Sequence, residues 1–304
     1  VFGTTSTDDE VFITPTITTG QGIGSTGPGM AIGFNFVLDG VTFDRIGISA
    51  NGFIYLGQSV NVPSIFTSMS NQFNPISSTA PGNPITQYKV SAFALDIQAQ
   101  NGSELRMETI GTTPNRVMVV QWLNYRKYNN TGDAFNFQIR LNETTNQIDV
   151  IYGSCTNNTT AGLAEIGLRG NNPNDFNNRF VNALNTWNSS APGNNNSVKA
   201  NFNNSLLPNN GLDFNWSPPP PCSSVAGTNT VLASLTTICP NGTSTLSLAN
   251  SYTNSGIYYT WQACTTTSNG TYLSYTGNNV NIFIPSNIGT STWFRCVVGC
   301  LYST

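Results

Sequence analysis

The residues best suited to covalent chemistry in this chain are six cysteines, five of which follow a run of four prolines, Pro218 to Pro221. Clustered cysteines in a chain with few charges are typical of disulfide bonds in an oxidising, extracellular setting. The 304 residues include no histidine. Catalysis by Ser-His-Asp or Cys-His groups and His-ligated zinc or haem are therefore excluded.

Two disulfides are predicted after the proline run. The order Cys239, Trp261, Cys296 across short alternating strands is the signature of an immunoglobulin-like sandwich, in which the tryptophan packs on an inter-sheet disulfide. We therefore predict a Cys239–Cys296 bond. A second bond, Cys222–Cys300, would tie the end of the proline run to the last strand.

Cys155 and Cys264 are left without an assigned partner. One alternative is that they pair with each other. The others are that they stay free thiols or have partners beyond Thr304.

Acidic side chains occur in two patterns that bear on catalysis or metal binding. Glu104, Arg106 and Glu108 share one face of a predicted strand, which separates the two carboxylates by about 13 Å. A glycosidase needs them about 5–10 Å apart, so this pattern indicates a solvated charge ladder. Oxygen-rich segments at 8–10 and 171–178 are candidates for calcium, but their spacing fits no fixed calcium loop and favours turns. We expect no metal or cofactor, with calcium as the alternative.

Three aromatic residues, Trp122, Tyr125 and Tyr128, lie close together beside amide side chains. An exposed row of aromatic rings next to amides can stack on sugars, so these three are the candidate glycan-binding residues. The alternative is ordinary strand packing, with Tyr125 on the opposite face of the strand from Trp122.

Apolar and polar residues alternate through most of the chain, which is the period of a β-strand. In residues 135–142 the apolar side chains fall on one face, whereas residues 117–122 predict a strand buried on both faces. Asp39-Gly40 and similar pairs are turn signals between strands. Two long polar segments, 58–87 and 171–210, are predicted loops and the places where we expect binding. Strands are predicted at 11–18, 30–38, 41–49, 53–57, 88–97, 103–110, 147–153, 163–169 and 211–216, and after the prolines at 231–238, 244–249, 256–263, 279–284 and 292–299.

The proline run divides the chain, because four prolines hold an extended form without backbone donors and suit a spacer. We predict a jelly-roll-like β-sandwich over residues 1–217, a linker over 218–221 and an immunoglobulin-like β-sandwich over 222–304. The second sandwich is predicted to be incomplete at its C-terminus. The fold class is therefore all-β.

The charge content is low: 8% of residues are charged, against about 25% in ordinary soluble proteins. A net charge of -3 argues against nucleic acid or an anionic membrane as a partner. No run of about 20 apolar residues is present, so we expect no membrane insertion.

The last predicted strand leaves the second sandwich one strand short. Either the sequence continues beyond Thr304, or another subunit supplies the strand and builds a fibre. The extended, apolar and Thr-rich stretch near the N-terminus is the candidate donor for such strand exchange, through Val11, Phe12, Ile13 and Ile17.

Several motifs are spread over the chain: IGFNF at 32–36, ISANGFIYLG at 48–57, NFQIRL at 136–141, CPNG at 239–242 and WFRCVVGC at 293–300. Together they resemble a block followed by immunoglobulin-like repeats in large, type IX-secreted, adhesin-like surface proteins of the Bacteroidetes. The resemblance implies export to the cell surface. It supplies no catalytic residues.

These observations predict a non-enzymatic, extracellular structural or adhesive protein of the cell surface, either the subunit of a fibre or a fragment of a large adhesin. Its expected partners are further copies of itself, in a homo-oligomer or fibre, or cell-surface glycans or proteins. The alternative is a carbohydrate-binding module of a secreted hydrolase.

Overall fold

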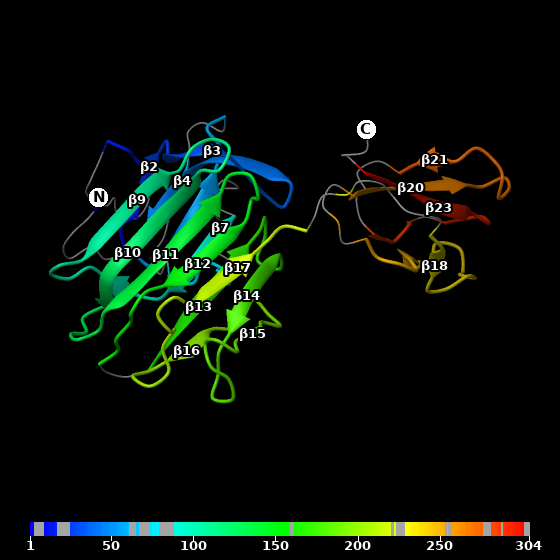
Figure 1. Ribbon diagram of the computed structural model, residues 1–304. Coiled ribbons are helices and arrows are strands. Elements are labelled where there is room, and N and C mark those ends of the chain that lie inside the picture. The colour runs from blue at the N-terminus through cyan, green and yellow to red at the C-terminus, as the bar shows by residue number, and fades with distance from the viewer. Residues whose placement is uncertain are drawn as a thin grey trace. The chain divides into compact units, whose positions relative to one another are not determined.

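The computed structural model divides the chain into two compact units, Val1–Ser217 and Pro218–Thr304. All the regular secondary structure in the described residues consists of β-strands (Figure 1), which confirms the all-β prediction. Across these residues, no helix has the length and hydrophobicity that crossing a membrane would require. The structure describes residues 1–2, 9–16, 25–60, 65–66, 73–78, 88–158, 161–219, 222, 229–252, 254, 257–275, 281–286 and 288–300.

The larger sheet of the first unit has nine antiparallel strands. Its path runs β1-β4-β5-β7-β13-β14-β15, with β3 beside β4 and β16 beside β13. The strands are β1 (Val11–Phe12), β3 (Met30–Leu38), β4 (Val41–Ser49), β5 (Phe53–Gly57), β7 (Lys89–Ala94), β13 (Gly162–Arg169), β14 (Phe176–Phe180), β15 (Ala191–Pro192) and β16 (Ala200–Phe202).

The second sheet of this unit has six antiparallel strands, in the path β17-β12-β11-β10-β8 with β9 beside β10. A separate two-stranded ribbon joins β2 (Thr26–Gly27) and β6 (Ile65–Phe66). The strands of the six-stranded sheet are β8 (Ile97–Gln98), β9 (Glu104–Ile110), β10 (Val117–Lys127), β11 (Phe135–Asn142), β12 (Ile148–Tyr152) and β17 (Asp213–Trp216).

One hydrophobic cluster joins these two sheets into a sandwich. Along β11 every second side chain is buried, as the alternation in the sequence predicts. Phe135 and Phe137 of β11 meet Phe93 of β7, with ring centroids 4.8 and 5.7 Å apart. The prediction that residues 117–122 are buried on both faces is wrong, because the side chains between the buried ones are half-exposed.

The second unit contains two three-stranded antiparallel sheets, β18-β19-β22 and β21-β20-β23. Its buried cluster consists of Leu246, Trp261 and Phe283, and the Trp261 and Phe283 rings stack at 5.7 Å. The strands are β18 (Val231–Ala233), β19 (Leu246–Leu248), β20 (Ile257–Cys264), β21 (Leu273–Ser274), β22 (Ile282–Phe283) and β23 (Trp293–Cys300).

Candidate functional site

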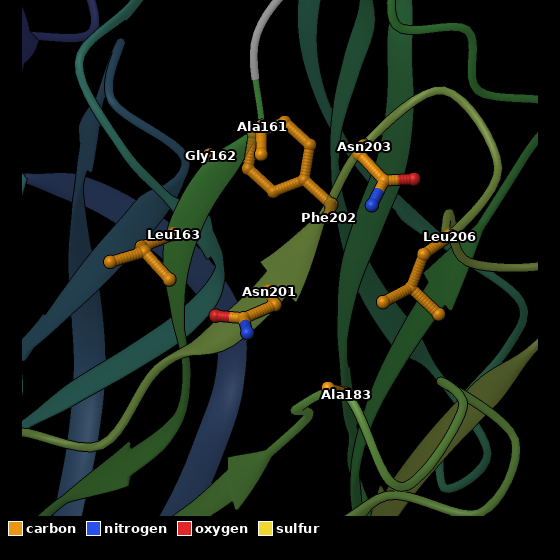
Figure 2. A pocket seen from close by; sticks show the side chains of 8 residues that line it. All are labelled: Ala161, Gly162, Leu163, Ala183, Asn201, Phe202, Asn203 and Leu206. Carbon is orange, nitrogen blue, oxygen red and sulfur yellow. The ribbon is translucent and has the colours of Figure 1, made fainter.

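A pocket of about 350 Å³ opens on the first unit where β13 lies beside β16 (Figure 2). In the strand register, Gly162 is opposite Phe202 and Leu163 is opposite Asn201. The pocket is lined by Ala161, Gly162, Leu163, Ala183, Asn201, Phe202, Asn203 and Leu206. Five of these residues come from the predicted binding loop 171–210.

Phe202 forms a fixed wall of the pocket. It is fully buried, and its ring packs 5.0 Å from Phe93 and 5.5 Å from Phe135. The ring lies so close to Gly162 that a Cβ atom there would overlap it. The absence of a side chain at residue 162 therefore allows Phe202 to occupy this position.

Two asparagines supply the polar groups of the pocket. The backbone of Asn201 is held on both sides, because its N–H donates to Val181 and its carbonyl accepts from the Trp187 indole. The Asn203 side-chain oxygen accepts from the N–H and hydroxyl of Ser205 at 2.8 and 2.9 Å. Figure 2 shows the Asn203 amide nitrogen on the side of the other lining residues.

The chemistry of this lining is neutral. Amide donors and acceptors lie beside the apolar side chains of Leu163, Phe202 and Leu206, and none of the eight lining residues carries a charge. Such a surface suits an uncharged ligand that has both polar and apolar faces, because an ion would find no opposite charge.

The predicted aromatic row is not a surface feature. Trp122 and Tyr125 are fully buried, and only Tyr128 is exposed, at 45%. A β-bulge between Trp122 and Tyr125 inserts one residue into β10, where Asn124 has a φ of +57°. Because the bulge shifts the alternation by one, Trp122 and Tyr125 both face the core. The glycan-binding assignment is therefore wrong for Trp122 and Tyr125, and it stays a prediction for Tyr128.

The predicted cysteine pairing is half right. Cys222 and Cys300 form a disulfide with Cα atoms 5.9 Å apart, which confirms that bond. Cys239 and Cys296 are free thiols, so the predicted bond between them is wrong. The predicted strand 231–238 ends at Ala233, which leaves Cys239 in an exposed turn, whereas Cys296 packs against the cluster of Leu246, Trp261 and Phe283.

The other two cysteines, Cys155 and Cys264, are also free thiols. Cys155 lies in the first unit, and burial raises the pKa of its thiol to about 11. Its protonated, unreactive form therefore dominates at neutral pH.

The predicted strand donor belongs to the core of its own unit. Val11 and Phe12 form β1 and pair with Ser49 and Ile48 of β4. Val11, Phe12 and Ile13 are each at most 1% exposed. Their apolar side chains are already covered, so the assignment as a donor strand is wrong for them. Ile17 lies outside the described residues.

The carboxylates considered for catalysis or metal binding make local contacts instead. Arg106 donates to Glu104 on the exposed face of β9, as expected for a charge ladder. Among the described residues, no group of three or more His, Cys, Asp or Glu side chains is arranged to hold a metal ion. In the segment 171–178, the Asp175 carboxylate accepts from the Asn171 N–H at 3.2 Å and stabilises a turn.

Asp39 and Asp175 form a close carboxylate pair beside Gly170, where a Cβ atom would contact both side chains. Partial burial, followed by repulsion from and hydrogen bonding to Asp175, raises the pKa of Asp39 to about 6. Asp39 therefore holds a proton in mildly acidic solution. Sequence reasoning missed the pair because the two residues come from distant turns.

Comparison with known proteins gives one match. A family model described as "NIDO related" matches residues 5–218, which is most of the chain and covers nearly all of the first unit. No curated protein and no solved structure matches. The family match indicates an extracellular domain of adhesive type, and the Cys222–Cys300 disulfide fits a secreted protein.

Proposed function

The chain belongs to the NIDO-related family, and from this membership we propose that it is a non-enzymatic structural or adhesive protein of the cell surface. The observation that carries the proposal is the family match over residues 5–218. Two further features support it. The first unit is a sandwich around one continuous core, and the second is closed by a disulfide, as durable extracellular domains often are.

The proposed partners are further copies of the chain, in an oligomer or fibre, or glycans and proteins of cell surfaces. Export by the type IX route is also part of the proposal, and its support is the sequence resemblance to Bacteroidetes surface proteins. The low charge of the chain favours contacts through neutral polar and apolar groups.

The test is a binding and assembly measurement on the full chain. We expect purified protein to form filaments in electron micrographs or to attach to cells in flow cytometry. Leu184, which is 93% exposed beside the pocket residue Ala183, offers a surface variant, Leu184→Ser. Leu232→Ser, on an exposed site of the second unit, is the matched control. A monomer that attaches to no cell, glycan or matrix protein would contradict the proposal, as would hydrolysis of a polysaccharide or peptide.

A second candidate function, binding of a neutral sugar, is favoured by the pocket itself. Its volume of about 350 Å³ and its pairing of amides with apolar side chains fit an uncharged sugar unit. We expect binding to a glycan array that Asn201→Ala weakens about tenfold, since one lost hydrogen bond costs about 1–1.5 kcal/mol. Asn204→Ala, on an exposed neighbour outside the lining, should leave binding unchanged. A blank array would exclude this function.

A further inference from the structure

Lys127, the last residue of β10, has an unusual position for a lysine. It is only 7% exposed. The bulge at Asn124 is the cause, because it places Tyr125 and then Lys127 on the core side of the strand. A regular strand from Trp122 onward would instead have turned Asn124 and Arg126 inward.

The Lys127 ammonium meets two buried polar side chains. Its Nζ donates to Oδ1 of Asn157 at 2.6 Å and lies 3.7 Å from Oδ2 of Asp133. Asn157 is 5% exposed and Asp133 is 2% exposed. An amine, a carboxamide and a carboxylate are therefore gathered in one site that excludes bulk water.

The two oxygens of Asp133 have different surroundings. Oδ1 accepts the Asn158 N–H at 3.0 Å. Oδ2 is fully buried and receives no hydrogen bond from the described residues. The Lys127 ammonium lies 3.7 Å from Oδ2, so Oδ2 is placed to accept a proton from it.

Aromatic rings complete the site. The Lys127 ammonium lies 5.5 Å from the centre of the Phe202 ring, and Phe202 packs against Phe135. A buried ion pair with such walls is a weak source of stability, because removing both charges from water costs as much as their attraction returns. An amide between Lys127 and Asn157 would remove the charge of the ammonium from this site.

We propose that Lys127 and Asn157 react with each other in the folded protein to form an intramolecular isopeptide bond. Asp133 accepts a proton from the ammonium, and the neutral Nζ attacks Cγ of Asn157, which is one C=O bond of about 1.2 Å beyond the contacted oxygen. The Nζ–Cγ bond forms and the Cγ–Nδ2 bond breaks. Asp133 returns its proton to the departing nitrogen and then takes the second proton from Nζ as the amide forms. Ammonia leaves and takes up this proton as ammonium.

The overall reaction is balanced without an added reagent. A lysine ammonium and an asparagine carboxamide give one secondary amide and one ammonium ion, with no change in oxidation state. Holding the two groups in contact supplies the rate enhancement that an intermolecular reaction between amine and amide lacks. The bond would join the end of β10 to the segment that follows β12, and it does not depend on the proposed adhesive function.

A second lysine–asparagine contact in the same unit serves as an internal comparison. Lys199 donates to the side-chain oxygen of Asn74, but both residues are only half-buried. The carboxylate that acts on Lys199 is Glu165, and both of its oxygens already accept hydrogen bonds, from the Ile76 N–H and the Ser77 hydroxyl. This contact therefore lacks a free proton acceptor and should not react.

The test is the intact mass of the reduced full chain, followed during incubation at neutral pH. We expect a mass lower than that of the sequence by one ammonia, and a branched peptide that joins Lys127 to Asn157 after proteolysis. Lys127→Arg and Asp133→Asn should each restore the full mass and abolish the branched peptide. Lys199→Arg should leave the ammonia loss unchanged.

The wild-type measurement decides the proposal even if a variant fails to fold. A folded wild-type chain that keeps its full mass and yields no branched peptide would overturn it. So would a branched peptide joined at Asn158 or at Asn74, or an ammonia loss that persists in Lys127→Arg.

Discussion

The first unit buries a continuous hydrophobic cluster that joins two large sheets, whereas the buried cluster described in the second consists of Leu246, Trp261 and Phe283. The second unit adds the Cys222–Cys300 disulfide. The difference follows from size, because the buried fraction of a chain falls as a domain becomes smaller. A short domain with a small core needs a covalent link that a larger sandwich can omit.

The units also differ in charge. All 14 acidic residues precede Pro218, and of the 11 lysines and arginines only Arg295 follows it. Arg295 donates to Gln262 and lies over the Tyr272 ring at 4.2 Å. The second unit is therefore held almost entirely by neutral contacts, while the first combines its core with ionisable groups.

The largest expected effect is the loss of a core tryptophan. Trp122→Ala and Trp261→Ala should each cost about 3–5 kcal/mol. Because Trp261 is one of three clustered side chains, its loss should unfold the second unit, while the larger core of the first survives the loss of Trp122. Hydrogen exchange of the full chain, measured separately for peptides of each unit, shows which unit unfolds in each variant. Trp293→Ala, at a 38% exposed site of β23, is the control, and slow exchange in Trp261→Ala would contradict the comparison.

Removal of the disulfide comes next. The double substitution Cys222→Ser and Cys300→Ser should lower the free energy of unfolding of the second unit by about 4 kcal/mol, since the closed loop is long. The first unit should keep its stability. Cys239→Ser, at an exposed free thiol, should change stability by less than about 0.5 kcal/mol. Equal losses of stability in both units on thermal unfolding would show that the disulfide does not stabilise the second unit specifically.

A glycine substitution made in both units should have unequal effects. Gly162→Ala places a Cβ against the buried Phe202 ring and should cost about 1–3 kcal/mol. Gly299→Ala meets the ring of Tyr258, which is 37% exposed and can rotate away, so a smaller cost is expected. Urea unfolding of the two variants measures the free energy of unfolding that each substitution costs. The reverse order would mean that Tyr258 is held as firmly as Phe202.

The smallest effect is a pH dependence confined to the first unit. The pKa of Asp39 is raised from 3.8 to about 6, so the folded state holds this proton more tightly than the unfolded state. The stability that this proton contributes is therefore present below about pH 4 and is lost as the pH rises to about 6. Asp39→Asn should flatten this part of the profile of the first unit, while the second unit stays unchanged. An unaltered profile in the variant would assign the dependence to other carboxylates.

The sequence predicted the strands better than their faces. Alternation in residues 135–142 correctly gave β11 and its buried side. In β10 the same reasoning placed Tyr125 on the opposite face from Trp122, which is wrong because one inserted residue reverses the alternation. The only local signal is Asn124, whose side chain tolerates a positive φ. Bulges depend on contacts with the neighbouring strand, which a single sequence does not display.

The candidate sites were harder to predict. The predicted loop 171–210 supplies five of the pocket residues, but Gly162 and Leu163 reach the same pocket from β13 through strand pairing. The group of Lys127, Asp133 and Asn157 is assembled in the same way from three separate segments. The residues of both sites come together only through the register of the sheets, and their spacing along the chain does not predict this.

The Cys222–Cys300 disulfide also determines how the second unit responds to mechanical tension. It bonds the first residue after the proline run to the end of β23. A pulling force applied at these two residues passes directly through the sulfur–sulfur bond. Residues 223–299 therefore carry none of the load, and the small core between them is not stretched until that bond is reduced.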